Sequence, residues 1–319
     1  NNIEFPIQRF CHTIGNNCNH RCFCTLFLSH SHIEHSPYTD DYQLNEMNYR
    51  LATDHAEMNP LRRNTMEDVH RIVQCLDGDQ SISYFGVYDG HGGRQIVDFL
   101  ENALEKNIAI ELKQPDNGSI LERLARAYLI TDMQSRQQNL TTSGATAVSA
   151  LLINAPTGRT VYVANVGDSR AVLCCQTGYN GQVSNSSGAG YMALRMSYDH
   201  RAEDEAEQKR IKDAGGFIAR GRVLGILAVS RSFGDHGMKD FICASPHLSQ
   251  ACLNEHGDCP FLVLACDGVW DVLTDQQAVD LILDKYLLSG PFEAAAHLLV
   301  HTALEKGSAD NVTAVVVFL

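Results

Sequence analysis

The chain has 319 residues, of which 44% are hydrophobic and 20% are charged, so it can bury a sizeable core without disulfide bonds. Its 25 basic and 38 acidic residues give a formal net charge of −13, which argues against nucleic acid as the main ligand, because binding a phosphate backbone requires clustered Lys and Arg. No apolar run approaches the roughly 20 residues that cross a bilayer, so we predict no membrane span.

Residues 1–46 are polar, rich in Cys and His, and without hydrophobic periodicity, whereas the sequence from 47 to 319 has a globular composition. We predict an N-terminal extension followed by one domain. The spacing in CHTIGNNCNHRCFC matches no standard zinc module, so a poorly ordered extension is expected. The odd count of 11 Cys, several of them in apolar stretches, suits a reducing compartment and predicts a cytoplasmic or nuclear protein.

Seven short runs rich in β-branched and aromatic residues predict strands, at 69–76, 82–88, 145–153, 160–166, 170–175, 261–266 and 311–319. Five segments with helical periodicity predict helices, at 93–108, 119–138, 201–215, 274–288 and 291–307. Ser119 and Thr274 are expected N-caps, and Gly307 a C-cap. Because the strands follow one another like hairpins and the helices come in pairs, we predict an α+β fold of stacked antiparallel sheets with helices outside.

Acidic residues stand at the ends of several predicted strands, namely Asp89 in FGVYDGHGG, Asp168 in VANVGDSR, Asp267 and Asp271 in LVLACDGVWD, Asp310 in KGSADNVTA, and Glu67 with Asp68 in NTMEDVH. Each of these alone is typical of a turn. If the strand ends converge, however, their carboxylates repel one another unless cations neutralise them. Oxygen donors without a supporting set of Cys or His favour Mg²⁺ or Mn²⁺ over zinc.

Nine short motifs carry a resemblance to a known family, and they are, in chain order, RxxMED, DGHGG, SGATA, VGDSR, SYDH, AGG, RVLGILAVSRSFGD, CDGVWD and DNVT. Over residues 47–319 the chain resembles the metal-dependent protein phosphatases of the 2C type, which act on phosphoserine and phosphothreonine in proteins. The resemblance implies a four-layer αββα sandwich, in which pairs of helices flank two antiparallel sheets. It also implies a flap at about 176–225 beside the cleft.

The resemblance further implies a centre of two Mn²⁺ or Mg²⁺ ions. Asp89 matches the carboxylate that bridges both ions, and the carbonyl of Gly90 matches a direct ligand. Asp267 and Asp310 match ligands of the first ion, and Glu67 matches a ligand of the second, partly through water. Asp168 and Asp271 match residues that in some members help to hold a weaker third ion. A hydroxide bridging the two metals would attack phosphorus directly, without a covalent phosphoenzyme.

Two further residues are expected to act on the phosphoester. Arg63 occupies the arginine position of RxxMED, and a planar, permanently charged guanidinium suits the phosphoryl oxygens. The residues just before it, Pro60–Leu61–Arg62, depart from the glycine usual in the family, which puts the shape of this loop in doubt. His91 is expected to protonate the leaving Ser or Thr oxygen, because histidine titrates near neutrality. Residues 143–147 and 222–235 are interpreted as scaffold.

Two alternatives stay open at this stage. One is a catalytically inactive pseudophosphatase that serves as a binding or regulatory module. Such proteins usually lack a metal carboxylate, whereas Asp89, Asp267 and Asp310 are all present here. The other is a different two-metal enzyme, such as a nuclease, for which a basic track along the polymer would be expected. We expect phosphorylated proteins as partners, no nucleic acid, and a monomer, as is usual for the family.

Overall fold

The computed structural model of the chain describes residues 48–176 and 190–319. The predicted extension over 1–46 and residues 177–189 of the expected flap lie outside the described residues.

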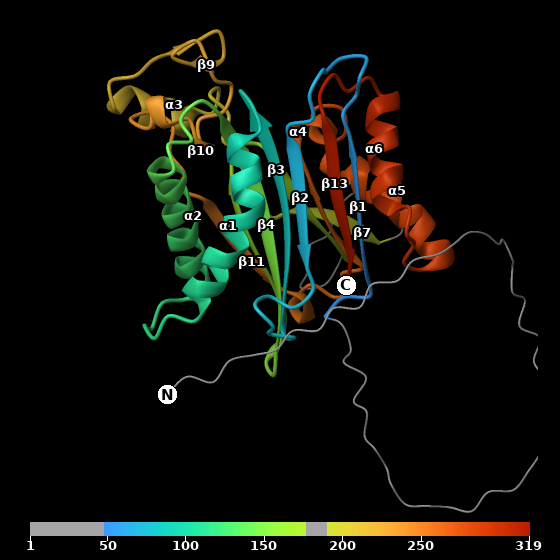
Figure 1. Ribbon diagram of the computed structural model, residues 1–319. Coiled ribbons are helices and arrows are strands. Elements are labelled where there is room, and N and C mark those ends of the chain that lie inside the picture. The colour runs from blue at the N-terminus through green and yellow to red at the C-terminus, as the bar shows by residue number, and fades with distance from the viewer. Residues whose placement is uncertain (1–47, 177–189) are drawn as a thin grey trace, which may run out of the picture. The chain divides into compact units, whose positions relative to one another are not determined.

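Two antiparallel sheets stack on each other, as predicted (Figure 1). The first sheet contains, in spatial order, β1 (Leu51–Glu57), β13 (Val312–Phe318), β12 (Phe261–Ala265), β6 (Arg170–Gln176) and β7 (Tyr191–Arg195). The second contains β11 (His247–Cys252), β5 (Gly158–Val166), β4 (Gly144–Ala155), β3 (Ile82–His91) and β2 (Asp68–Val73), with the short β10 (Phe233–Gly234) paired to β4. The α+β sandwich expected from the sequence is therefore confirmed.

Helices cover the outer face of each sheet (Figure 1). Against the second sheet lie α1 (Gln95–Leu112) and α2 (Ile120–Gln137), and against the first lie α4 (Asp267–Trp270), α5 (Asp275–Ser289) and α6 (Ala295–Glu305). The predicted N-caps are confirmed, since Ser119 and Thr274 each form a capping box. Gly307 follows the end of α6 with a φ of 90°, the left-handed conformation that glycine permits after a helix.

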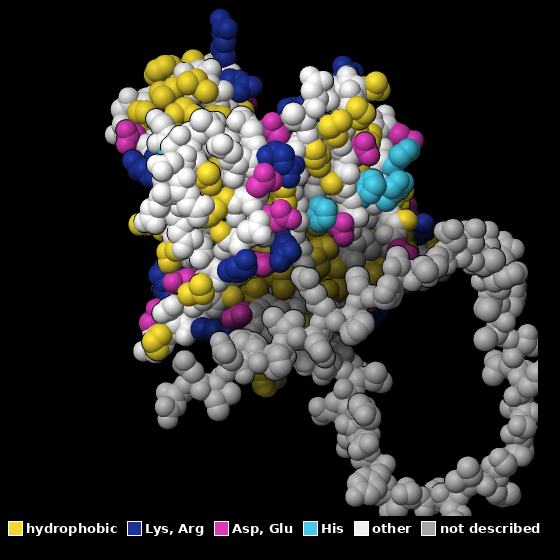
Figure 2. Space-filling view, viewed as in Figure 1, with side chains coloured by type: hydrophobic (Ala, Val, Ile, Leu, Met, Phe, Trp, Pro, Cys, Tyr) yellow, Lys and Arg dark blue, Asp and Glu magenta, His cyan; other side chains and the backbone are white. Residues whose placement is uncertain are grey.

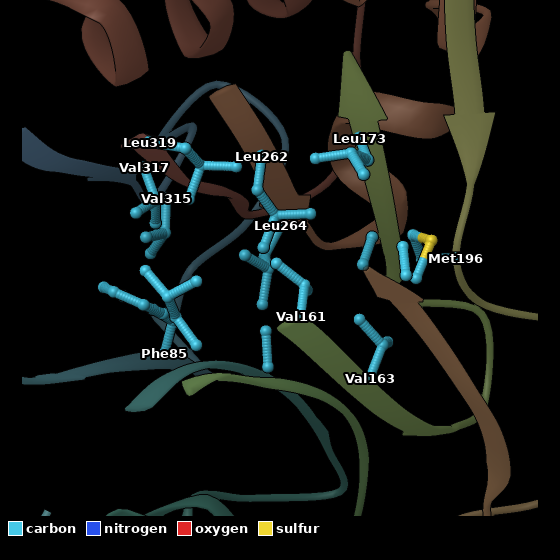
Figure 3. Close-up of a cluster of buried hydrophobic side chains, with 14 of the residues drawn as sticks. Phe85, Val161, Val163, Leu173, Met196, Leu262, Leu264, Val315, Val317 and Leu319 are labelled. Atoms are coloured by element: carbon cyan, nitrogen blue, oxygen red, sulfur yellow. The ribbon is translucent and has the colours of Figure 1, made fainter. Parts of the chain in front are cut away.

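The main core lies between the two sheets (Figure 3). Phe85, Val161 and Val163 face it from the second sheet, and Leu262 and Val315 from the first. Strand side chains alternate between the two faces of a sheet, so the neighbours of these residues pack instead against the helices in two further clusters. The sandwich thus has three apolar interfaces, which fix the positions of the strand ends relative to one another.

The segment between β7 and β11 lies beside one end of the two sheets and contains little sheet structure (Figure 1). It holds α3 (Glu205–Asp213), a small hairpin of β8 (Ile218–Ala219) and β9 (Arg222–Val223), and the 3₁₀ turn η2 (His236–Met238); a second 3₁₀ turn, η3 (Leu253–Glu255), follows β11. Ala202, Ile211, Val223 and Ile242 form its own small core. Part of the region expected to be a flap therefore has a hydrophobic cluster of its own.

Three sheet strands of five or more residues were missed by the sequence patterns, namely β1, β7 and β11. The edge strand β1, with sequence LATDHAE, carries charged and polar residues, and β7 is only five residues long. Thr53 shows why a polar residue fits β1, because its hydroxyl is buried and accepts a hydrogen bond from the N–H of Ala296 in α6 (3.2 Å).

Within the described residues, no helix is both long and apolar enough to span a bilayer. All seven described cysteines are free thiols.

Candidate metal centre

The acidic strand ends converge at one edge of the sandwich because of the way the strands pair. β2 begins where the antiparallel β3 ends, which places Asp68 opposite Asp89 in the ladder. In the other sheet, β13 begins where β12 ends, so that Asp310 and Asp267 flank paired strands. In Figure 1 the end of β3, the start of β2 and α4 lie at the same end, next to the segment that contains α3 and β9.

The central carboxylate is Asp89. Burial raises its pKa well above the ordinary value, and the negative charges of Asp68 and Asp267 raise it further. Asp267, the first residue of α4, has a raised pKa for the same reasons, with Asp168 and Asp310 as its strongest charged neighbours. Holding these carboxylates together therefore costs the protein electrostatic free energy, which a bound cation would offset.

Two buried oxygens at this edge fit a metal ion. Oδ1 of Asp267 and Oδ2 of Asp68 accept no hydrogen bond from the described residues. A ligand oxygen of Asp68, one of Asp89 and the sulfur of Cys266 lie within 4.8 Å of one another. Cys266 is not the expected kind of ligand, because burial raises its pKa and its thiol contacts the carbonyl of Asn311 (3.5 Å) and the N–H of Thr313 (3.1 Å). The remaining donors are hard oxygens, which suit Mg²⁺ or Mn²⁺.

Glu67 and Gly90 are in contact at the junction of β2 and β3. The N–H of Gly90 donates to the carbonyl of Glu67 (3.2 Å), and a Cβ at position 90 would lie 2.6 Å from that same carbonyl oxygen. Glycine is thus required for this close approach. The Glu67 carboxylate accepts hydrogen bonds from the hydroxyl of Thr65 (3.1 Å) and the N–H of Gly93 (3.2 Å), which orient it at the same edge.

Arg63 lies at this edge, but its guanidinium pairs with a predicted metal ligand. It forms an ion pair with Asp310, and its Nε donates to the carbonyl of Ala309 (3.3 Å). Asn311 anchors the loop that carries Arg63, since its side chain donates to the carbonyls of Met58 (2.8 Å) and Thr65 (3.0 Å). This anchoring holds the loop in place although Pro60–Leu61–Arg62 replaces the usual glycine.

His91, the last residue of β3, has a carboxylate partner that the sequence patterns did not reveal. Its Nε2 lies 2.8 Å from Oδ2 of Asp235, whose side chain is largely buried. Asp235 has a φ of 49° and also accepts a hydrogen bond from the hydroxyl of Ser232. Residues 222–235 were interpreted as scaffold, and the structure instead places Asp235 where it orients the imidazole.

Asp168 and Asp271, the residues matched to a third ion, lie at the two sides of one guanidinium. Nε of Arg201 is 3.3 Å from Oδ2 of Asp168, and its Nη2 donates to Oδ1 of Asp271 (2.6 Å). Burial raises the pKa of Asp168 to about 6, an effect that the positive charge of Arg201 opposes. No local pattern predicts this contact, because Arg201 is 70 residues away from Asp271 along the chain.

A cavity of about 160 Å³ joins these groups, and its lining includes Arg63, Asp89, Gly90, His91, Asp168, Asp267 and Asp310. Glu67 and Asp271 are not part of the lining. Arg222, also interpreted as scaffold, does line the cavity, together with Leu227 and Val229. Two arginines and several carboxylates therefore face one small space, which can hold cations and an anionic group side by side.

Comparisons with known proteins agree on one family. The model of the family described as "Protein phosphatase 2C" matches residues 54–312. "Protein phosphatase 2C homolog 1" from Saccharomyces cerevisiae is 35% identical over 304 residues, which cover 91% of this chain and 99% of the yeast protein. "Probable protein phosphatase 2C 59" from Oryza sativa subsp. japonica is 36% identical over 266 residues, covering 81% and 73% of the two chains.

Solved structures share the fold. The "Crystal structure of serine-threonine phosphatase 2C from Toxoplasma gondii" has a TM-score of 0.66 and 21% identity, covering 84% of this chain and 94% of that one, a likeness that shows the fold alone. The "Structure of a C.elegans sex determining protein" has a TM-score of 0.69 and 25% identity, covering 84% and 64% of the two chains.

Proposed function

The chain belongs to the protein phosphatase 2C family of protein serine/threonine phosphatases, and on this premise we propose that it hydrolyses phosphoserine and phosphothreonine in proteins at a centre of two Mn²⁺ or Mg²⁺ ions. The observation that carries the proposal is the convergence of Asp68, Asp89, Asp168, Asp267 and Asp310 at one sheet edge, with raised pKa values at Asp89 and Asp267. Carboxylates that are held together despite their burial and mutual repulsion suit a cation site.

Five residues would hold the ions. Asp89, whose pKa is raised by the charges of Asp68, Asp267, Asp168 and Asp310, would contribute its carboxylate to both ions. Asp267 and Asp310 would bind one ion, while Glu67 and the carbonyl of Gly90 would bind the other. When bound, the two ions would neutralise the charge of the phosphate and activate a water molecule for in-line attack.

The arginines would position the phosphoryl group. Arg63 is half-exposed and lies beside Asp310 at the cavity, so its guanidinium can turn from that carboxylate to a phosphoryl oxygen once a cation takes its place. Arg222 lines the same cavity from the β8–β9 hairpin. A phosphate between them would meet positive charge from both sides.

His91 would supply the proton that the leaving serine or threonine oxygen requires. Its Nε2 contacts Asp235, so this carboxylate fixes the ring orientation and stabilises the protonated imidazole. The second ring nitrogen, Nδ1, would then donate its proton to the leaving oxygen. Asp235 acts through His91 and is a positioning residue.

The alternative function, an inactive binding module, has no specific observation in its favour. All five proposed metal-binding residues are present, and they lie at one edge with Arg63 and His91. A pseudophosphatase would lack metal-dependent turnover, which therefore separates the two functions.

The proposed function is tested by measuring phosphate release from a phosphothreonine peptide with Mn²⁺, with Mg²⁺, and with excess EDTA. We expect release that needs the metal and stops with EDTA. Folded protein that binds metal yet releases no phosphate with either ion would contradict catalysis and favour the binding module.

A further inference from the structure

Arg201 has an unusual position among the acidic residues of the metal centre. It follows His200 on the segment that leads from β7 to α3, and its backbone is held by bridge pairing to Val229. Its side chain reaches two carboxylates from different parts of the fold, with 3.3 Å between Nε and Oδ2 of Asp168 and 2.6 Å between Nη2 and Oδ1 of Asp271. Asp168 follows β5, and Asp271 follows α4.

The charges explain why a cation belongs between these two residues. The side chain of Asp168 is 8% exposed, and burial together with the negative charges of Asp199 and Asp271 disfavours its ionised form. Among the described residues, Arg201 is the ion-pair partner of both Asp168 and Asp271. The guanidinium carries one positive charge where two carboxylates meet, so the pair stays partly unneutralised and still attracts a cation.

Arg201 differs from Arg63 in the carboxylates that it contacts. Arg63 pairs with one carboxylate of the centre, Asp310, whereas Arg201 lies between two, Asp168 and Asp271. Nε of Arg201 is buried, although 41% of the side chain is exposed. A divalent ion that used both Asp168 and Asp271 would have to move this guanidinium outward first.

We propose that Arg201 acts as a tethered cation between Asp168 and Asp271 and competes with a third divalent ion for these two carboxylates. The proposal rests on the proposed two-metal centre and deepens it, because it assigns the weakness of a third site in this chain to one residue. The centre then holds two ions firmly, and a third binds only when Arg201 swings away. Occupancy of the third position would depend on the free metal concentration, while the first two positions stay filled.

The test is a Mn²⁺ binding isotherm, measured by equilibrium dialysis with metal analysis, on the wild-type chain and on Arg201→Gln. We expect two firmly bound ions in both proteins, and a third ion that binds about tenfold or more tightly in Arg201→Gln, because one positive charge has been removed from its site. Arg201→Lys keeps a cation, and its third ion should stay weak. Arg126→Gln is the matched control, because Arg126 is also an ion-paired arginine, 37% exposed, but pairs with Glu111 and Asp116; its isotherm should equal that of the wild type.

The position of the gained ion is tested by adding Asp271→Asn to Arg201→Gln, which should remove it. A third ion with unchanged or weaker affinity in Arg201→Gln would overturn the proposal, as would a gained ion that persists in the double variant. If every variant bound two ions firmly but Arg201→Gln bound no third ion more tightly, this inference would be overturned while the proposed two-metal function would stand. A wild-type chain that binds no Mn²⁺ at all would overturn the proposed two-metal function, and the inference with it.

Discussion

At the scale of single residues, the metal centre combines groups that the sequence identifies with partners that only the fold reveals. The carboxylates could be predicted because each has a local signature, an apolar strand next to an aspartate. The contact between His91 and Asp235 could not, because it joins residues 144 positions apart and depends on how β10 approaches β4. Arg201 was missed for the same reason, as its role depends on two carboxylates from distant segments.

Asp68 gives a prediction for the pH dependence of stability. Burial raises its folded pKa to about 6, above the unfolded value of about 3.9. From about pH 4 to about pH 6 the unfolded chain releases this proton and the folded chain retains it, so metal-free protein loses stability as pH rises, by roughly 2–3 kcal/mol in total. Asp68→Asn removes this loss, and its stability relative to wild type should grow between pH 4 and pH 6 and then level off.

This prediction is checked by urea unfolding of both proteins in EDTA at several pH values. A stability difference that does not change with pH would show that Asp68 ionises alike in the folded and unfolded states. The same experiment with saturating Mn²⁺ should shrink the effect, because bound cations favour the ionised carboxylate.

His91 gives a prediction that depends on the substrate. His91→Ala should lower kcat on a phosphothreonine peptide by about 100-fold or more, since an alkoxide leaving group needs a proton. The loss on p-nitrophenyl phosphate should be much smaller, because its leaving group hardly needs one. Equal losses on both substrates would rule out the role of proton donor.

Asp235→Asn should reproduce the His91 pattern more weakly, lowering kcat on the peptide while the KM and the firmly bound Mn²⁺ stay unchanged. It should also shift the pH profile of kcat, which a purely structural residue would not do. Asp240→Asn is the control, because Asp240 is exposed and lies outside the cavity lining. A loss of Mn²⁺ binding in Asp235→Asn would place this residue in the metal centre instead.

At the scale of elements, the strands and helices with strong patterns were predicted well, and the weak ones were missed. The seven predicted strands and five predicted helices all exist, with ends that differ by a few residues. The sequence patterns missed β1 and β11 because edge strands tolerate polar and charged residues, and they missed β7 because five residues show no clear alternation. Pairing in a sheet, rather than local preference, makes these three segments strands.

The ladder between β3 and β4 gives a prediction about glycine. Gly144 pairs with His91, and a Cβ at position 144 would lie 2.1 Å from Oδ2 of Asp235 and 2.4 Å from Nε2 of His91. Gly144→Ala should therefore displace the imidazole, destabilise the protein by about 1–3 kcal/mol, and lower turnover while leaving metal binding intact. Gly237→Ala is the matched control, because nothing lies within 4 Å of a Cβ there. Wild-type turnover in Gly144→Ala would mean that His91 needs no fixed position.

At the scale of the whole molecule, the two sheets carry the site as one unit. Asp68 and Asp89 come from one sheet, and Asp267 and Asp310 flank strands of the other, so the shared core between the sheets sets the spacing of the carboxylates. Acidic and basic side chains are interspersed on the face that Figure 2 shows. The repulsion within the carboxylate cluster means that stability and metal binding are linked.

This linkage predicts that Mn²⁺ raises the thermal unfolding temperature. At a free concentration 100-fold above Kd, one site contributes about 2.7 kcal/mol, which is roughly 5–10 °C for a domain of this size. Asp89→Asn should lose most of this shift, yet unfold at a higher temperature than wild type in EDTA, because one of the repelling charges is gone. Asp284→Asn, at an exposed position of α5, should behave as wild type. If Asp89→Asn unfolded at a lower temperature than wild type in EDTA, this would contradict the proposed repulsion among the carboxylates.

The most direct test of the central claim is anomalous diffraction at the manganese edge from crystals of the chain soaked in Mn²⁺. Two strong peaks should lie on either side of the Asp89 carboxylate, one close to Asp267 and Asp310 and the other close to Glu67 and the carbonyl of Gly90. Peaks that avoid Asp89, in crystals of protein that releases phosphate in a metal-dependent manner, would contradict the assignment of the centre to this edge.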